Sequence, residues 1–188
     1  YGKKEQKVLA VDNVSFEVKH GEIFGLIGPD GAGKTSIFRM LTTVLLPNSG
    51  SASIENLDIV KDYKEIRKIL GYMPGRFSLY QDLTIEENLQ FFASVFNTTI
   101  AENYDLIKDI YIQIETFKDR RAGKLSGGMK QKLALCCALI HKPKVLFLDE
   151  PTTGVDPVSR KEFWEMLQRL KKQGITIVVA TPYMDEAA

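Results

Sequence analysis

Residues 28–35 read Gly-Pro-Asp-Gly-Ala-Gly-Lys-Thr and fit the pattern G-x-x-x-x-G-K-[ST], between an apolar run at 22–27 and a segment of helical pattern. Glycines allow the backbone to wrap with its N–H groups pointing inward at phosphate oxygens, and the following helix brings its positive end to the same place. Lys34 supplies a positive charge for the β- and γ-phosphates, and the Thr35 hydroxyl can coordinate Mg²⁺. The alternative is a glycine turn with a solvated lysine, which leaves the flanking strand and helix unexplained. The stretch therefore predicts a phosphate-binding loop.

Short apolar segments alternate with segments of helical periodicity on both sides of this loop. The later apolar runs are continuous, which predicts strands buried on both faces, as in a parallel sheet covered by helices. We therefore expect an α/β fold with a P-loop NTPase core, a mainly parallel sheet and a small N-terminal antiparallel β part where 15–18 and 22–27 meet at a turn. The other expected strands are 52–55, 69–73, 145–148 and 175–180, and the expected core helices are 34–45, 127–141 and one through 163–170.

The pattern changes between residues 78 and 124, where no strand is expected. Residues 84–87 form a capping box, in which Thr and Glu side chains accept from each other's backbone N–H groups, and this predicts a helix to about residue 96. A second helix is expected at 102–116. We therefore predict a helical subdomain at about 75–125, inserted in the P-loop ATPase core.

Two carboxylates, Asp149 and Glu150, directly follow the apolar strand 145–148. They are expected at the carboxyl end of a buried strand, where open α/β sheets bind their ligands. Asp149 would hold Mg²⁺ directly or through water, and Glu150 could polarise the water that attacks a phosphate. Alone, this pair could equally be a helix cap, but beside the phosphate-binding loop it indicates a metal and phosphate site.

The segment 125–131, Leu-Ser-Gly-Gly-Met-Lys-Gln, predicts a second anion site at the start of a helix. Ser126 is a good N-cap, and Gly127 and Gly128 leave bare backbone N–H groups. Taken alone, the segment is an ordinary junction between a loop and a helix.

Composition excludes several classes of protein. With 44% hydrophobic and 26% charged residues, the 188-residue chain is of ordinary globular type. A net charge of +1 gives no electrostatic footprint for nucleic acid, so no nucleic-acid partner is expected. Cys136 and Cys137 lie in an apolar helical run and match no zinc or redox spacing, which indicates two small buried side chains.

These motifs together resemble those of the nucleotide-binding domain of ABC transporters. The phosphate-binding loop (the family's Walker A), the Leu-Ser-Gly-Gly signature, the strand before Asp149 and Glu150, and Gly-Val-Asp-Pro at 154–157, which is similar to the D-loop, occur in the family's order and spacing. The resemblance covers essentially the whole chain. Residues 79–84 and 183–187 are most similar to bacterial ABC-2-type exporters.

The resemblance implies ATP and Mg²⁺ as cofactors and a head-to-tail dimer with ATP between the loop of one subunit and the signature of the other. Lys34 and Glu150 are the implied catalytic residues, and Thr35 and Asp149 the implied Mg²⁺ ligands. Tyr1 stands where the family has an aromatic residue that stacks on adenine; the alternative is a surface tyrosine. The other implied nucleotide contacts are Gly28, Pro29, Asp30, Gly31, Ala32, Gly33, Lys34, Thr35 and Ser36, with Ser126, Gly127 and Gly128 acting on the partner's ATP.

Two residues depart from the family pattern. Gly75 follows Gly-Tyr-Met-Pro where the family has a glutamine that reaches Mg²⁺ and the attacking water. Pro182 stands after the last strand where the family has a histidine that contacts the γ-phosphate. Thr181 and Pro182 suit the N-cap and first position of a helix, so the departure is compatible with the fold but removes a contact.

Three functions are therefore compared. The first is an ATPase that powers a bacterial exporter through ATP binding and hydrolysis. The second is a degenerate ATP-binding half of an asymmetric pair with little hydrolysis of its own, which Gly75 and Pro182 favour and the retained Glu150 opposes. The third is a soluble ABC ATPase without a transport role. It is disfavoured because the long insertions or basic arms of such ATPases are absent from these residues.

The resemblance also implies the partners and the setting. They are a second nucleotide-binding domain, as a homodimer, heterodimer or tandem half, and transmembrane permease subunits that recognise the cargo. The permease would dock around residues 76–87, on the cytoplasmic side of the bacterial inner membrane. Residues 1–188 would be one such domain shortened at both ends, because these domains continue through further strands and a closing helix.

Overall fold

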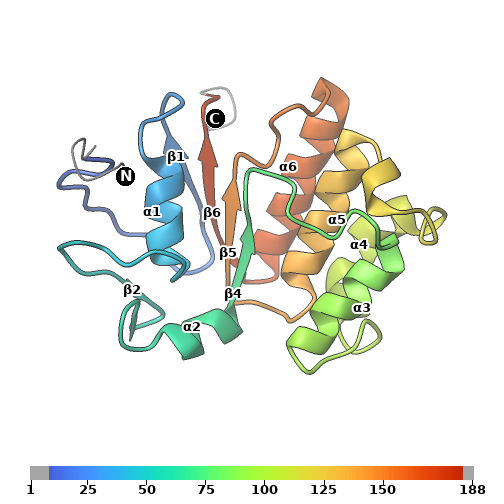
Figure 1. The fold of residues 1–188 in the computed structure, drawn as a ribbon, viewed down its shortest axis with the longest axis horizontal. Helices are drawn as coiled ribbons and strands as arrows, with labels where there is room; N and C mark the ends of the chain where they lie inside the picture. The colour runs from blue at the N-terminus through green and yellow to red at the C-terminus, as the bar shows by residue number, and fades with distance from the viewer. Residues whose placement is uncertain (1–8, 184–188) are drawn as a thin grey trace.

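The computed structural model describes residues 9–183, and its centre is a four-stranded parallel sheet (Figure 1). The strands are β1 (Ile23–Ile27), β4 (Leu70–Met73), β5 (Val145–Asp149) and β6 (Thr176–Thr181), in the spatial order β1-β6-β5-β4. Because all pairs are parallel, the carboxyl ends of all four strands meet at one edge of the sheet. The predicted parallel sheet is confirmed.

The two middle strands, β5 and β6, are buried at every position. Successive residues belong to different cores: Leu146 and Leu148 pack on one face of the sheet, whereas Val145 and Phe147 pack on the other. This explains why both strands are continuously apolar in sequence. Burial of both faces requires helices on both sides of the sheet.

One face is covered by α1 (Lys34–Leu41) and, further along, by α2 (Tyr63–Ile69). Phe38 of α1 meets Phe147 of β5 edge to face, with ring centroids 5.2 Å apart. Next to these helices lies the small antiparallel hairpin of β2 (Ser53–Ile54) and β3 (Leu57–Asp58).

The other face is covered by α5 (Gly127–Leu139) and α6 (Pro157–Lys172). The outer helices α3 (Ile85–Val95) and α4 (Tyr104–Glu115) pack on α5, followed by a short 3₁₀ turn, η1 (Ala122–Lys124) (Figure 1).

The capping box at the start of α3 forms as predicted. The Thr84 hydroxyl accepts from the backbone N–H of Glu87 at 3.1 Å, and the Glu87 carboxylate accepts from the N–H of Thr84 at 2.8 Å. These bonds satisfy two N–H groups that the helix itself leaves unpaired. The helix therefore begins where the local sequence dictates.

Three expectations about the elements were wrong. Residues 15–18 form no strand: Phe16 stacks on Phe24 of β1 at 5.2 Å without ladder bonds, and the antiparallel pair among residues 9–183 is β2 with β3. The helix expected to residue 45 ends at Leu41, because Thr43 is left-handed (φ +61°) and the N–H groups of Val44 and Leu45 turn back to the carbonyl of Arg39 at 2.8 Å. The short helix α2 was not anticipated.

Within residues 9–183 no helix has both the length and the apolar character needed to cross a membrane. Cys136 and Cys137 are free thiols in the core of α5, as predicted. Burial raises the pKa of both thiols well above the ordinary value, so neither is a nucleophile in the folded chain.

Candidate nucleotide-binding site

The predicted phosphate-binding loop joins β1 to α1 at the carboxyl edge of the sheet. Its first residue, Gly28, donates its backbone N–H to the carbonyl of Thr181 at the end of β6, at 3.3 Å. Gly31 and Gly33 have φ angles of +79° and +92°, a backbone conformation that is unfavourable for residues with a side chain. At Gly33 a Cβ would also collide with the carbonyl of Ala10. The loop therefore needs glycine for its conformation and for the close approach of a neighbouring segment.

A cavity of about 280 Å³ opens beside this loop. Three of its walls are the loop, the first turn of α1 and the carboxylate that follows β5. The lining residues are Leu9, Ala10, Gly31, Gly33, Lys34, Thr35, Ser36 and Glu150. The structure thus brings together the phosphate-binding loop and Glu150, which lie far apart in the sequence.

Lys34 lies at the base of this cavity with only 5% of its surface exposed. Its Nζ donates to the carbonyls of Gly28 and Pro29 at 2.7 and 2.9 Å, and lies 3.9 Å from Glu150 Oε1. The ammonium group is therefore held between the loop and an acidic side chain. This places a fixed positive charge where an anionic ligand of the loop would lie.

Asp149, the last residue of β5, is 2% exposed and lies near the side chain of Thr35. Its Oδ1 is buried and has no hydrogen-bond partner among residues 9–183. Burial raises the pKa of this carboxyl, an effect opposed by the Thr35 hydroxyl and by the charges of Lys34 and Arg39. An orphaned carboxylate oxygen beside a hydroxyl is a fitting pair of ligands for Mg²⁺, which completes its shell with water and phosphate oxygens.

This pair is suited to a metal that arrives with its nucleotide. The described residues contain no cluster of three or more His, Cys, Asp or Glu side chains that could hold a metal ion unaided. Thr35 and Asp149 would supply two ligands, and the phosphates would supply others.

Glu150 turns away from the line of β5 because its backbone is left-handed, with φ +50°. Its N–H donates to the carbonyl of Ala180 at 2.8 Å, which fixes the turn against β6. The side chain remains 26% exposed and lines the cavity, whereas the neighbouring Asp149 is buried. The two neighbouring carboxylates therefore point in different directions, as the sequence predicted, and their roles remain predictions.

The Ser-Gly-Gly segment lies at the start of α5 and does not line this cavity. The Ser126 hydroxyl accepts from the N–H of Met129 at 3.3 Å and caps the helix. A Cβ on Gly127 would lie 3.4 Å from the carbonyl of Gly154, and one on Gly128 would lie 3.2 Å from the hydroxyl of Ser159. The glycines thus let the helix start pack closely on the neighbouring loop and on α6. The structure does not bring this segment to Lys34 of the same chain.

Gly75 lies directly against the carboxylate strand. A Cβ added there would be 3.0 Å from the backbone carbonyl of Asp149 and 3.7 Å from Cβ of Glu150. Position 75 is therefore adjacent to both carboxylates, but its glycine reaches neither with a side chain.

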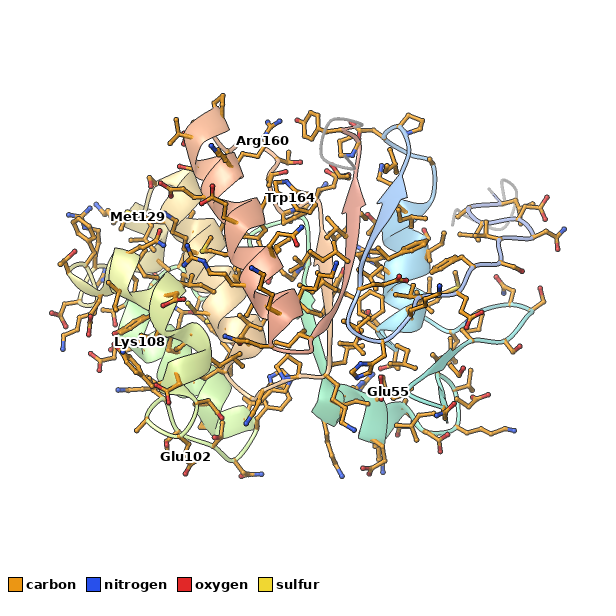
Figure 2. The ribbon with its side chains drawn as sticks, turned by 180° about the vertical axis from the view of Figure 1, so that it is seen from behind. Glu55, Glu102, Lys108, Met129, Arg160 and Trp164 are labelled. Atoms are coloured by element: carbon orange, nitrogen blue, oxygen red, sulfur yellow. The ribbon has the colours of Figure 1, made fainter. Side chains whose placement is uncertain are left out.

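The segment after β6 begins with Thr181 and Pro182, and the helix predicted to follow lies beyond the described residues. The Thr181 hydroxyl accepts from the N–H of Tyr183 at 3.1 Å, as an N-cap residue does. The guanidinium of Arg160 stacks over the Tyr183 ring at 4.6 Å, and Figure 2 shows Arg160 at the end of the molecule where β1 and β6 finish. Pro182 itself offers no polar side chain.

Two further residues near Asp149 were not identified from the sequence. Burial together with the charge of Asp149 raises the pKa of Tyr72 to about 12, and the nearby guanidinium of Arg39 opposes this rise. Arg39 stands one helical turn after Thr35, which was the only signal available without the pairing of β4 and β5. Of the predicted ligands, Tyr1 lies outside the described residues, and Asp30 is exposed, as its charge requires beside an anion site.

Comparison with known proteins agrees with this geometry. Residues 11–153 match the ABC transporter family, and the chain belongs to that family. It is 43% identical over 98% of its length to a protein named "Probable multidrug ABC transporter ATP-binding protein YbhF" from Escherichia coli K12, covering 32% of that protein. It is 41% identical over 98% of its length to "Nod factor export ATP-binding protein I" from Burkholderia thailandensis, covering 62% of it. The chain thus spans 32% and 62% of the lengths of these two relatives.

Solved structures show the same fold. A dimeric, post-hydrolysis structure of the ATP-binding cassette MJ0796 with ADP and Pi has a TM-score of 0.88 at 25% identity, covering all of this chain and 86% of that one. A second structure, cbiO1 from Clostridium perfringens, described as part of the transporter complex cbiONQ, has a TM-score of 0.80 at 29% identity, covering 94% and 73%. The P-loop NTPase cassette fold predicted from the sequence is confirmed.

Proposed function

We propose that this chain is the nucleotide-binding domain that powers an ABC exporter by binding and hydrolysing Mg²⁺-ATP. The observation that carries the proposal is the arrangement of Lys34, Thr35 and Asp149: a buried cation, a hydroxyl and an orphaned carboxylate oxygen meet at one cavity. Relatives with names of exporters and a dimeric cassette structure support the same assignment.

The phosphates of ATP would lie on the backbone N–H groups of residues 28–36, with Lys34 neutralising the β- and γ-phosphates. Thr35 and Asp149 would hold Mg²⁺, which would supply positive charge to neutralise the phosphates and the charge that develops in the transition state. Glu150 would orient the attacking water and accept its proton, since its carboxylate faces the cavity beside Lys34.

Ser126, Gly127 and Gly128 would contact the nucleotide of a second domain in a head-to-tail dimer. Their position supports this, because they do not line the cavity of their own chain and present a capped helix start. The partner would be another cassette, as a separate subunit or a tandem half.

The permease of such an exporter would dock on the inserted helices, which follow β4 and the adjoining Gly75. Tyr80 and Phe91 offer a partly exposed aromatic pair there, with ring centroids 4.8 Å apart. This would hold the chain at the cytoplasmic side of the bacterial inner membrane, bound through its permease. The helical subdomain at about 75–125 would be the part specialised for this contact.

A degenerate, slowly hydrolysing site is the second candidate, and Gly75 favours it. Position 75 lies 3.0 Å from the Asp149 carbonyl when a Cβ is added, so a side chain there would be beside both carboxylates, and none is present. Pro182 removes a second contact. In this second candidate function the chain binds ATP to close the dimer, and its Ser126–Gly128 segment contacts the ATP that a catalytically active partner hydrolyses.

Single-turnover hydrolysis by the assembled dimer separates the two candidates. Glu150→Gln in this subunit alone is expected to abolish nearly all phosphate release at an active site, and to change it little if the partner's site does the work. Glu165→Gln, an exposed residue on α6, is the matched control. Lys34→Ala should abolish nucleotide binding in both cases, and retained binding would overturn the assignment of the loop.

Pro182→His tests the missing contact directly. A rise in turnover would show that this contact limits the rate at the Lys34 site. An unchanged rate would show that Gly75 or the partner sets the limit.

A further inference from the structure

A fully buried amide on α3 holds the backbone of the loop that precedes this helix. Asn88 has 0% of its surface exposed, and its carboxamide needs partners for both its donor and its acceptor groups. Its Oδ1 accepts from the N–H of Tyr80 at 3.1 Å, and its Nδ2 donates to the Tyr80 carbonyl at 3.0 Å. The same Nδ2 lies 3.3 Å and 2.8 Å from the carbonyls of Leu83 and Thr84. One side chain therefore fixes the shape of the loop 80–84.

This loop is in turn bonded to the 3₁₀ turn η1, which comes shortly before α5. The N–H of Gly123 donates to the Gln81 carbonyl at 2.9 Å, and the N–H of Ala122 donates to the Leu83 carbonyl at 2.8 Å. The two segments lie so close that a Cβ on Gly123 would be 3.2 Å from the Gln81 carbonyl. Ala122 is 0% exposed and packs in the same core as α5. The loop and η1 therefore form one unit, and Asn88 holds it from inside.

The chain passes from η1 to the start of α5 through a single residue, Leu125. Leu125 is 6% exposed, and its N–H donates to the Ala122 carbonyl at 3.3 Å. Ser126 follows and caps α5 by accepting from the N–H of Met129. The place at which α5 begins is therefore set from two sides, by its own cap and by the unit that Asn88 holds.

We propose that Asn88 is a positioning residue for the partner's nucleotide: it fixes the loop 80–84 and, through the bonds of that loop to η1, the position of the segment Ser126–Gly128. The inference rests on the proposed head-to-tail dimer, in which this segment contacts the ATP held by the second domain. Asn88 does not line the cavity at Lys34 of its own chain, so its effect is expected only at the partner's site. Substitution of a residue that acts on a distant site typically changes the coupling by about 2- to 30-fold.

The test is a dimer of the full-length protein with one remaining nucleotide site, assembled from two differently labelled copies. One copy carries Lys34→Ala and contributes only its Ser126–Gly128 segment, and the other carries Ser126→Arg and contributes only its phosphate-binding loop. Energy transfer between the labels gives the concentration of Mg²⁺-ATP at which association is half-maximal. Asn88→Ala in the first copy is expected to raise this concentration about tenfold. The same change in the second copy should leave it unchanged, because the segment of that copy is already disabled.

A second variant acts on the next contact of the unit, because the loss of a fully buried amide can also unfold the inserted helices. Gly123→Ala pushes a methyl group against the Gln81 carbonyl and should raise the same concentration, again only in the first copy. Gln113→Ala is the control: it removes an exposed amide on α4 and should change nothing in either copy.

The placement of each substitution separates positioning from a general loss of stability. An unchanged Mg²⁺-ATP concentration for every variant that folds would overturn the inference. An equal rise in either copy would also overturn it, because a packing defect acts wherever it is placed. If the one-site dimer with Asn88 and Gly123 intact shows no ATP-dependent association, the proposed head-to-tail dimer fails instead, which distinguishes the two failures.

Discussion

Asp149→Asn is expected to stabilise the nucleotide-free protein while abolishing its Mg²⁺-dependent nucleotide binding. The carboxylate is 2% exposed, one of its oxygens has no partner among residues 9–183, and burial outweighs the nearby positive charges, because the pKa is raised. An amide of the same shape keeps an oxygen beside Thr35 but carries no charge into the interior. Asp149 is therefore required for the proposed binding of Mg²⁺ but destabilises the protein when no nucleotide is bound.

The size of the effect follows from the difference between a charged and a neutral unpaired group. A buried unsatisfied polar atom costs about 1–3 kcal/mol and a charged one more, so removal of the charge should gain about 1 kcal/mol. For a chain of this length that corresponds to a rise in Tm of about 2–4 °C.

The effect should depend on pH in one direction. Because the pKa of Asp149 is higher in the folded than in the unfolded protein, the carboxyl stabilises the fold only while it is protonated. That stabilisation is complete below its ordinary, unfolded pKa and is lost as the pH rises through the raised folded value. The advantage of Asn should therefore be full at neutral pH and vanish below about pH 4.

Thermal unfolding in EDTA, from pH 4 to 8, measures both parts of this prediction. Glu150→Gln is the matched control: its side chain is partly exposed and 3.9 Å from Lys34, so its Tm should change by less than about 2 °C. A lower Tm for Asp149→Asn at neutral pH would refute the reasoning, because the attraction of Lys34 and Arg39 would then exceed the penalty of burial.

The structure leads to three further predictions. Gly33→Ala should lower the free energy of unfolding, measured in urea, by about 2 kcal/mol or more, because the φ of this residue is +92° and the added Cβ would meet the Ala10 carbonyl. Gly31→Ala should lower it by about 1 kcal/mol, because its φ is also positive but the added Cβ would lie in open space. Leu89→Ala, fully buried under α5, should lose about 2–5 kcal/mol in the same assay. Cys136 and Cys137 should react with a thiol reagent no faster than the chain unfolds, and fast labelling of the native protein would contradict their burial.

The parts of the fold that the sequence predicted are those determined by neighbouring residues. The capping box at Thr84, the buried strand before Asp149 and the glycine loop each depend on a few consecutive side chains. The predicted strand at 15–18 was wrong because a strand requires a hydrogen-bonded neighbouring strand. The sequence around Phe16 does not show that its ring stacks on Phe24 while its backbone pairs with no strand. The proximity of Arg39 to Tyr72 depends on the register of β4 and β5, which no local pattern contains.

The order of the strands suggests how binding and hydrolysis separate in this chain. β5 lies between β4 and β6, so Asp149 and Glu150 are flanked by the loop with Gly75 and by the segment with Pro182. In the proposed mechanism Mg²⁺-ATP is bound by the loop that follows β1 and by Asp149 at the end of β5. The two flanking segments, which contain Gly75 and Pro182, lack the polar side chains that the family uses in hydrolysis. Position 182 is the better site to restore, because a Cβ at position 75 would lie 3.0 Å from the Asp149 carbonyl, and the strand end that carries the proposed Mg²⁺ ligand would have to move by a few tenths of an ångström. Gly75→Gln should therefore disturb Mg²⁺ binding before it can assist hydrolysis, whereas Pro182→His should leave binding intact.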